Sequence, residues 1–411
     1  MSPMKQFYDL VVIGAGPAGS AAAIHGVAAG HDVLLLESGE LGRDKTCGDG
    51  LTPRAIHELA KLGLAHTLTS HYANHGLKLH GYGGSVTAPW PDSAYGRVGS
   101  AMPRTRFDEL LARTAAERGA TLMTSATAHS PVVTDGRLTE FTVEERQIRA
   151  KWVIVADGVR STFGKALGRK WHQGEVYGIA ARSYVDSPRS TEPWMHSHVE
   201  LRDAAGTLQP GYGWVFPLGD GRLNLGCGAL STTARPAKLN TKKLLTHYTD
   251  TLREEWGLGQ PQAVASALLP MGGAVSNVAG ENWLIIGDAA AGVNPLNGEG
   301  IDYGLEMADL AVNLLGSGDD LRSAWPALLR EQYGEAFLLA RTAARLLTYP
   351  KFLPAVGPLA LRGPVGAALM PAAARLMANL VTDEDRDLMA RLWRTGGHAV
   401  SLARRGSPLW S

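Results

Sequence analysis

Apolar and polar residues in the first forty positions follow the patterns of a strand, a helix and a second strand. Tyr8 to Ile13 and Val33 to Leu36 are short apolar runs, which are typical of buried parallel strands. Between them, Ser20 to Ala29 is rich in alanine and is followed by Gly30, which predicts a helix that ends at a glycine. The chain therefore opens with a βαβ unit.

The rest of the chain predicts strands and helices in a mixed order. Helices are expected at residues 56–62, 107–118, 301–315 and 324–347, and buried strands at 152–156 and 283–286. Further strands are expected within 77–90, 120–141, 177–184, 196–201, 214–216 and 223–228. This order predicts a discontinuous nucleotide-binding domain of residues 1–70, 101–170 and 266–345. A β-rich lobe of residues 71–100 and 171–265 interrupts that domain, and a helical region follows at 346–411.

The turn after the first strand has the spacing Gly14-x-Gly16-x-x-Gly19. In such a motif the first glycine permits a tight turn, the second lets a pyrophosphate approach the backbone, and the third lets helix and strand pack closely. Glu37 ends the second strand, where a carboxylate can bind a ribose hydroxyl. A glycine-rich turn without a ligand is the alternative, but strand, helix and acid are all in place. The candidate cofactor residues of this unit are Gly14, Gly16, Pro17, Ala18, Gly19, Glu37 and Ser38.

A second glycine-rich turn follows the strand at 283–286. Asp288 can bind a cofactor hydroxyl there, and the turn leads into the helix at 301, whose N-terminus offers free N–H groups. This segment resembles the second FAD fingerprint of glutathione-reductase-type and aromatic-hydroxylase-type flavoproteins, which implies FAD as the cofactor. It adds the candidate residues Gly287, Asp288, Pro295, Gly298, Gly300 and Ile301.

Three more residues resemble positions near the pyrophosphate in the same superfamily. Asp157 and Gly158 follow the strand at 152–156, and Arg104 opens the segment Arg104-x-x-Phe107-Asp108. For Arg104 and its neighbour Arg106, a solvated surface arginine is the alternative.

Two further segments resemble the geranylgeranyl reductase family. Asp44 to Leu51 is similar to the cysteine motif of that family, and Gly211 to Pro217 is similar to its Tyr-x-Trp-x-Phe-Pro signature. Pro210 departs from the pattern, because it lies one residue closer to Tyr212 than usual. The stretches 48–54, 269–275 and 287–305 resemble the branch of the family that saturates one isoprene unit of a menaquinone tail.

The resemblance implies an α/β fold in which an antiparallel substrate sheet is inserted into a Rossmann-like FAD-binding domain of the glutathione-reductase and p-hydroxybenzoate-hydroxylase type. It also implies an FAD-dependent reductase that saturates a C=C bond of long-chain menaquinone or another prenyl lipid. Lys45, Cys47 and Gly48 are expected beside the flavin, and Cys47, Tyr212 and Trp214 are the expected catalytic residues. A small buried residue is the alternative for Cys47.

The residues themselves also favour a hydrophobic, elongated substrate. Tyr212, Trp214 and Phe216 alternate along a predicted strand, so their side chains share one face. Aromatic rings on one face can form a wall for a prenyl chain, and ordinary sheet core is the alternative. Together with Pro217, these three are the expected substrate-binding residues.

Composition and charge narrow the remaining classes. The net charge is +1, so no bulk field favours nucleic acid, and two cysteines do not indicate a disulfide framework. No metal site is predicted, and a cytoplasmic protein is expected. Residues 341–380 combine apolar segments with the basic residues Arg341, Arg345, Lys351, Arg362 and Arg375 and contain no acid. That pattern suits peripheral contact with the inner face of an anionic membrane, with a helical cap over the substrate lobe as the alternative.

Two rival functions and one open question remain. A flavin monooxygenase or halogenase acting on an aromatic substrate would use similar motifs, with Lys78 as a conceivable catalytic lysine. A non-catalytic prenyl carrier on the same fold, like the Rab escort proteins, is the second rival. No second dinucleotide fingerprint is apparent, so the electron donor is open between NADPH and another reductant or partner.

Overall fold

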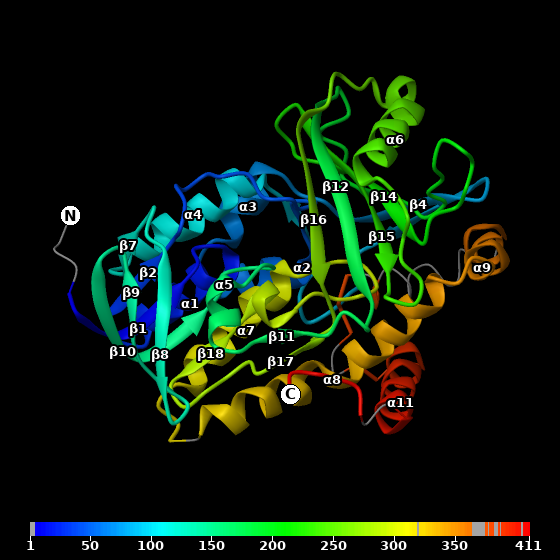
Figure 1. The fold of residues 1–411 in the computed structure, drawn as a ribbon. Coiled ribbons are helices and arrows are strands. Elements are labelled where there is room, and N and C mark those ends of the chain that lie inside the picture. Colours follow the sequence, from blue (N-terminus) through cyan, green and yellow to red (C-terminus); the bar gives the residue numbers. More distant parts are fainter. Residues whose placement is uncertain are drawn as a thin grey trace.

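The computed structural model describes residues 5–318, 320–363, 375–376, 378–381, 385–386, 388–403 and 406–411. Two large sheets organise this part of the chain, each of seven strands. One sheet lies with helices α1, α4, α5 and α7, and the other lies beneath helix α6 (Figure 1). The α/β fold expected from the sequence is confirmed.

The first sheet contains the βαβ unit. Strands β7 (Thr121–Met123), β2 (Val33–Leu36), β1 (Phe7–Ile13) and β10 (Arg146–Val155) are adjacent and parallel, and β18 (Trp283–Ile285) pairs with β10. Strands β9 (Arg137–Val143) and β8 (Ala128–Thr134) extend the sheet as an antiparallel hairpin from β10. Asp135 and Gly136 form the hairpin turn, both with positive φ. The carboxyl ends of β1, β10 and β18 therefore bring three separate turns to one edge.

Helices cover the central strands of this sheet. Helix α1 (Pro17–Ala28) begins three residues before the expected start, because Pro17 is well suited to the first turn of a helix. Ala18 on α1 lies against the backbone of α7 (Ile301–Leu314), where a Cβ added at Gly304 would be 3.2 Å from the Cβ of Ala18. The other helices are α2 (Pro53–Lys61), α3 (Ala65–His71), α4 (Arg104–Glu117), α5 (Thr162–Ala166) and α8 (Leu321–Leu347).

The second sheet has the order β16-β12-β15-β14-β13-β4-β5. Its strands are β16 (Gln262–Pro270), β12 (Tyr177–Asp186), β15 (Arg222–Ser231), β14 (Gly211–Pro217), β13 (Met195–His198), β4 (Gly76–Gly81) and β5 (Gly84–Pro89). All pairs are antiparallel except β13 with β4. Strand β16 runs five residues past 265, the expected end of the β-rich lobe. The division of the chain into domains stays a prediction.

Helix α6 (Thr241–Trp256) was not expected from the sequence and covers one face of the second sheet. Its buried residues Leu244, Tyr248 and Trp256 pack with Val215 and Cys227 in one hydrophobic cluster. The rings of Tyr212, Trp214 and Phe216 belong to the opposite face, because side chains alternate along β14. The second sheet therefore has one face under α6, and its other face carries these rings and a second hydrophobic cluster that includes Leu77, Leu79 and Met195.

The remaining elements connect the sheets or follow them. Short pieces are β3 (Gly50–Leu51), β6 (Ser100–Ala101), β11 (Lys170–Trp171), β17 (Val275–Ser276) and the 3₁₀ helix η1 (Gly287–Ala290). Helices α9 (Phe352–Leu361) and α11 (Leu388–Ala403) lie in the C-terminal region. Among the described residues, no helix has both the length and the apolar character needed to cross a bilayer. Within the segment 341–380 that was expected to contact a membrane, residues 364–374 and 377 lie outside the described residues.

Candidate active site

The glycines of the first turn differ in what surrounds them. A Cβ at Gly14, whose φ is +104°, would lie 2.4 Å from the backbone oxygen of Ala156, and a Cβ at Gly19 would lie 1.8 Å from the oxygen of Gly14. Around Gly16 the nearest atom is Nη2 of Arg104, at 3.9 Å. The turn is therefore tight on the protein side and open beside the N-terminus of α1, as a pyrophosphate group requires. These residues fit the FAD that the motif implies.

Glu37 lies buried at the end of β2, directly beside this turn. Its Oε2 accepts a hydrogen bond from the N–H of Ala15 at 3.0 Å, and its Oε1 accepts from the N–H of Gly39 at 3.1 Å. Arg43 forms an ion pair with Oε1 at 3.2 Å, while the neighbouring Ser38 is exposed. The carboxylate is thus held in place at the strand end, where a cofactor ribose is expected.

Arg104 and Arg106 have different environments, although the sequence treats them alike. Arg104 is buried at the start of α4 and forms a bidentate ion pair with Asp108. Its Nε and Nη2 lie 2.6 and 2.7 Å from the two carboxylate oxygens. Arg106 is exposed. Since Arg104 also lies beside Gly16, it remains our candidate for the cofactor phosphates, and Arg106 is a surface residue.

Lys45 brings two of the predicted turns together. Its Nζ pairs with Oδ2 of Asp288 at 3.1 Å, and a Cβ at Gly158 would lie 3.7 Å from the same nitrogen. Burial raises the pKa of Asp288, but the nearby charges of Lys45 and Arg104 outweigh it and hold that pKa below its ordinary value. Asp288 is therefore an anion, and Lys45 is its ion-pair partner. Asp157 binds locally, since its Oδ2 accepts from the N–H of Phe163 at the start of α5.

The cysteine loop, residues 44–50, packs against the aromatic face of β14. A Cβ at Gly48 would lie 3.1 Å from the ring of Phe216 and 3.6 Å from Nε1 of Trp214. The ring centroids are 5.9 Å apart for Tyr212 and Trp214, and 6.2 Å apart for Trp214 and Phe216. The two segments of the family resemblance, far apart in the chain, thus form one wall with the loop at its edge.

Gly226 on β15 makes room for the largest ring of this wall. Gly226 is the strand partner of Trp214, and a Cβ there would lie 2.1 Å from the indole ring. Pro217 follows the wall at the buried end of β14. The indole therefore packs over Gly226, which has no side chain at the point of contact.

Cys47 is half-buried and carries a protonated thiol. Burial raises the pKa of Cys47, although the charge of Arg104 opposes that effect. Its Sγ accepts a hydrogen bond from the N–H of Asp49 at 3.4 Å. The thiol is consequently a weak acid of the loop rather than a thiolate nucleophile.

Sequence reasoning missed the polar residues that fasten the cysteine loop to the second sheet. Nδ2 of Asn224 donates to the backbone oxygen of Cys47 at 2.7 Å and to Oδ2 of Asp49 at 2.8 Å. Arg182, fully buried on β12, binds the carboxylate of Asp44 and the backbone oxygen of Lys45. Asn224 and Arg182 are polar residues within largely apolar strands, and this pattern in the sequence could have revealed them. Burial raises the pKa of Asp49 to about 6, against hydrogen bonds from Tyr184 and Asn224.

The second fingerprint reaches the aromatic wall through Tyr212. The hydroxyl of Tyr212 donates to the backbone oxygen of Asn297 at 2.5 Å, and Oδ1 of Asn297 accepts from the N–H of Glu299 at 2.8 Å. A Cβ at Gly300 would lie 3.3 Å from Oδ1 of Asp288. Pro295 is buried, Gly298 is exposed with φ +77°, and Ile301 begins α7. The structure thus brings the loop 294–300 between Asp288 and the wall.

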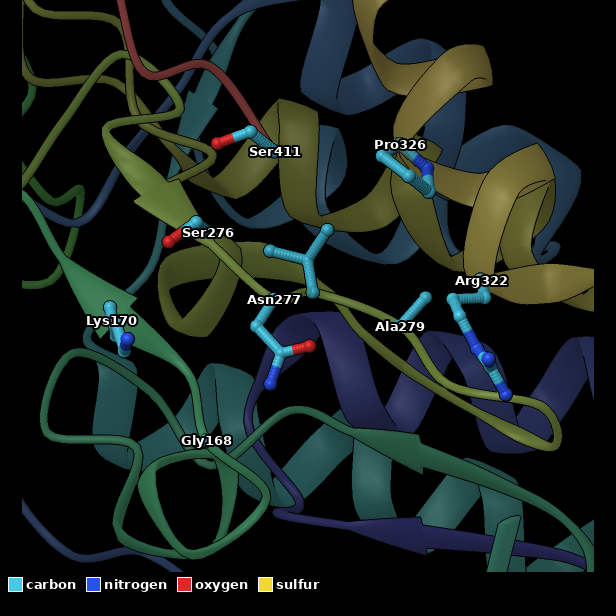
Figure 2. A pocket seen from close by; sticks show the side chains of 9 residues that line it. Gly168, Lys170, Ser276, Asn277, Ala279, Arg322, Pro326 and Ser411 are labelled. Atoms are coloured by element: carbon cyan, nitrogen blue, oxygen red, sulfur yellow. The ribbon is translucent and has the colours of Figure 1, made fainter. Parts of the chain in front are cut away.

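A separate cavity of about 280 Å³ lies away from these residues (Figure 2). It is bounded by the short strands β11 and β17, by α8 and by the C-terminal Ser411, with Lys170, Asn277 and Arg322 at its rim. None of the expected site residues lines it. The convergence of motifs, and not this cavity, therefore defines the candidate site.

Comparisons with known proteins agree with this arrangement. A family model described as an FAD binding domain matches residues 8–317. The chain is 51% identical to a menaquinone reductase of Mycobacterium tuberculosis, covering 97% of this chain and 98% of that protein. It is 29% identical to digeranylgeranylglycerophospholipid reductase 1 of Methanopyrus kandleri, covering 83% and 90%. A solved geranylgeranyl bacteriochlorophyll reductase-like structure from Thermoplasma acidophilum has a TM-score of 0.72 at 20% identity, covering 98% and 99%.

The family model covers most of the chain, and the identity to the mycobacterial protein extends along nearly its whole length. The protein uses FAD, and it belongs to the menaquinone reductase family of FAD-dependent oxidoreductases.

Proposed function

We propose that this protein is a menaquinone reductase that saturates one C=C bond of the prenyl tail of long-chain menaquinone. The observation that carries the proposal is the contact between the cysteine loop and the aromatic wall, at the edge of the FAD site. An isolated alkene accepts hydride poorly, so the site must hold the chain in a fixed pose and exclude water.

Each part of the site has a proposed role. The open turn at Gly16, together with Arg104, would hold the cofactor pyrophosphate, and Glu37 and Asp288 would bind its hydroxyls. When bound and reduced, FAD supplies the hydride. Tyr212, Trp214 and Phe216 would orient the tail, and the loop around Cys47 would close the reacting end against water. Pro217, the last residue of β14, is buried and would fix the direction in which the strand ends.

The halogenase alternative is weakened by the position of Lys78. Lys78 on β4 is the strand partner of His196, and His196 is in turn the partner of Val215. Paired residues share a face, so Lys78 belongs to the α6 face and not to the face of Trp214. A catalytic lysine would need to lie on the other side of the sheet.

Anaerobic single turnover tests the proposal. Purified protein, reduced with dithionite, is mixed with long-chain menaquinone, and the extracted quinone is analysed by mass spectrometry. We expect a product that carries two more hydrogens, together with reoxidation of the flavin absorbance. Flavin that stays reduced, with quinone of unchanged mass, would rule the proposal out. A colourless protein that takes up no FAD would favour the carrier alternative.

The two cysteines provide a matched pair of variants. Cys47→Ser should lower the single-turnover rate while leaving bound flavin, because the cysteine loop lies at the wall. Cys227→Ala should leave the rate unchanged, because Cys227 lies in the cluster under α6 on the other face. An unchanged rate in Cys47→Ser would reduce Cys47 to a packing role.

We also propose that the C-terminal region contacts an anionic membrane, but through fewer residues than the sequence indicated. The expectation was wrong for Arg341, which is fully buried and donates to the backbone oxygen of Gly272 at 2.7 Å. Arg375 is also engaged, in an ion pair with Asp385. The exposed candidates are Leu359 on α9, with 69% of its surface accessible, and the flanking Lys351 and Arg362.

Cosedimentation with vesicles that contain one-third anionic phospholipid tests this contact. Leu359→Glu should reduce binding several-fold, because it places an acid on an apolar surface beside anionic headgroups. Leu268→Glu, at a leucine that is 51% exposed on the edge strand β16, is the control and should bind as the unmodified protein does. Equal binding by both variants and the unmodified protein would contradict the assignment of α9.

A further inference from the structure

Glu299 is an acid in the site, and one of its two carboxyl oxygens is buried. The residue lies two positions before the start of α7, in the loop that joins Asp288 to the aromatic wall. Although the residue as a whole is half-buried, its Oε1 is out of contact with solvent and has no hydrogen-bond partner among the described residues. Such a group is costly unless it is neutral or has a function.

The loop that carries Glu299 contacts the aromatic wall. Its N–H donates to Oδ1 of Asn297, and the backbone oxygen of the same Asn297 accepts the hydroxyl of Tyr212. The carboxyl of Glu299 also interacts electrostatically with the thiol of Cys47 and with Tyr212. Glu299 therefore lies near both the aromatic wall and the cysteine loop, the two segments that would enclose the alkene.

Burial and the surrounding charges favour the protonated form of Glu299. Burial raises the pKa of Glu299 well above its ordinary value, and the carboxylates of Asp302 and Asp288 raise it further against the N–H groups of Ile301 and Asp302. Of the two carboxylates, Asp302 has the larger effect on the pKa of Glu299. Burial raises the pKa of Asp302 to about 6, and Arg54 and the amide of Asn379, which donates at 2.8 Å, oppose that rise. When Asp302 is ionised, its charge disfavours a second negative charge on Glu299.

We infer that Glu299 is the general acid that protonates the alkene carbon left without hydride. This inference rests on the proposed function. One alkene carbon gains the hydride from the reduced flavin, and the π electron pair forms a C–H bond at the other carbon with the proton of Glu299. The O–H bond of Glu299 breaks, which leaves a carboxylate that takes a proton back from water after the product departs. The two hydrogens and two electrons added to the tail are thereby accounted for.

The thiol of Cys47 and the phenol of Tyr212 are weaker acids than Glu299. The pKa of Cys47 is raised above that of an ordinary thiol, and burial raises the pKa of Tyr212 above that of an ordinary phenol. The hydroxyl of Tyr212 is also committed to the oxygen of Asn297. A carboxylic acid whose pKa is raised by burial comes closest to the operating pH, where general acids are most effective.

Glu299→Gln tests the inference with little change of shape. The variant should bind FAD and accept electrons from dithionite as before, while the reoxidation of its flavin by menaquinone slows roughly 100-fold or more. Glu281→Gln, on the surface in an ion pair with Arg137, is the matched control and should react at the normal rate. Reoxidation of Glu299→Gln within about twofold of the unmodified protein would overturn the inference.

The pH profile separates an acid from a merely structural residue. The rate should fall as pH rises through the pKa of Glu299, because only the protonated form can donate, and in Glu299→Gln this fall should be absent. Asp302→Asn removes the charge that raises this pKa, so the fall should move to lower pH. An unchanged profile in both variants would also overturn the inference.

Infrared spectroscopy provides a readout that needs no turnover. At pH 7 the protein without substrate should show a protonated-carboxyl stretch that disappears in Glu299→Gln and persists in Glu281→Gln. If the spectrum of Glu299→Gln keeps every protonated-carboxyl band of the unmodified protein, the inference is overturned. Unmodified protein that reduces no menaquinone overturns the proposed function and the donor role with it. Normal turnover by both the unmodified protein and Glu299→Gln overturns the donor role alone.

Discussion

The indole N–H of Trp214 donates to Oδ1 of Asn224 at 2.9 Å, so the largest ring of the aromatic wall is fixed by an amide on the neighbouring strand. The nitrogen of the same amide holds the backbone of Cys47 and the carboxylate of Asp49. One buried side chain therefore sets the distance between the wall and the cysteine loop. That distance matters if the alkene is to be held in one pose.

Asn224→Ala should slow the reaction with menaquinone by about tenfold or more, because it frees both the indole and the loop. It should also lower the free energy of unfolding by about 2 kcal/mol, since buried partners lose their hydrogen bonds. Asn240→Ala, which removes the side chain that caps α6, is the control. It should cost about 1 kcal/mol of stability and leave the rate unchanged. Equal rates for the two variants would contradict a positioning role for Asn224.

Gly226→Ala and Gly228→Ala test the contact under Trp214. A Cβ at Gly226 would lie 2.1 Å from the indole ring and must displace it, whereas the nearest atom to a Cβ at Gly228 is 3.5 Å away. Single-turnover rates should therefore fall strongly in Gly226→Ala and change little in Gly228→Ala, with FAD content normal in both. A normal rate in Gly226→Ala would show that the indole does not orient the substrate.

Gly16→Ala and Gly19→Ala separate cofactor binding from folding. At Gly16 a Cβ meets only the end of Arg104, so the variant should fold with a near-normal Tm. It should bind FAD at least tenfold more weakly, because the methyl group occupies the approach of the pyrophosphate. At Gly19 a Cβ collides with the backbone of Gly14, so that variant should be destabilised as well. FAD titration and thermal melts distinguish the two. Normal FAD affinity in Gly16→Ala would contradict the assignment.

A cluster of histidines beside α6 predicts how stability depends on pH. Burial lowers the pKa of His196 to about 4 and the pKa of His198 to about 3, so both are neutral in the folded protein. Their contribution to stability is complete above pH 6.5 and is lost as pH falls from about 6.5 toward 4, where the unfolded chain binds more protons. Denaturant midpoints measured across that range should fall.

His198→Asn should flatten this fall, and His66→Asn, at an exposed histidine on α3, should leave it unchanged. A slope that is the same in both variants and in the unmodified protein would exclude His198 as its source.

The sequence by itself determined the parts of the fold that depend on local periodicity. The apolar runs of β1 and β2, the glycine spacing between them and Glu37 at the strand end are all readable within forty residues. The shared face of Tyr212, Trp214 and Phe216 also followed from the two-residue period of a strand. Helix α6 was missed, although Asn240 before it and Gly257 after it are residue types that often begin and end helices.

Only the tertiary structure decided which distant residues meet. Lys45 and Asp288 pair across 243 positions, and no periodicity within either segment predicts that contact. The same limit explains Arg341, whose charge pattern suited a membrane surface although packing buries it against Gly272. The roles of Asn224 and Glu299 likewise depend on which strand or loop lies opposite. A side chain's local pattern fixes the face on which it lies, but the packing of the two sheets decides what that face contacts.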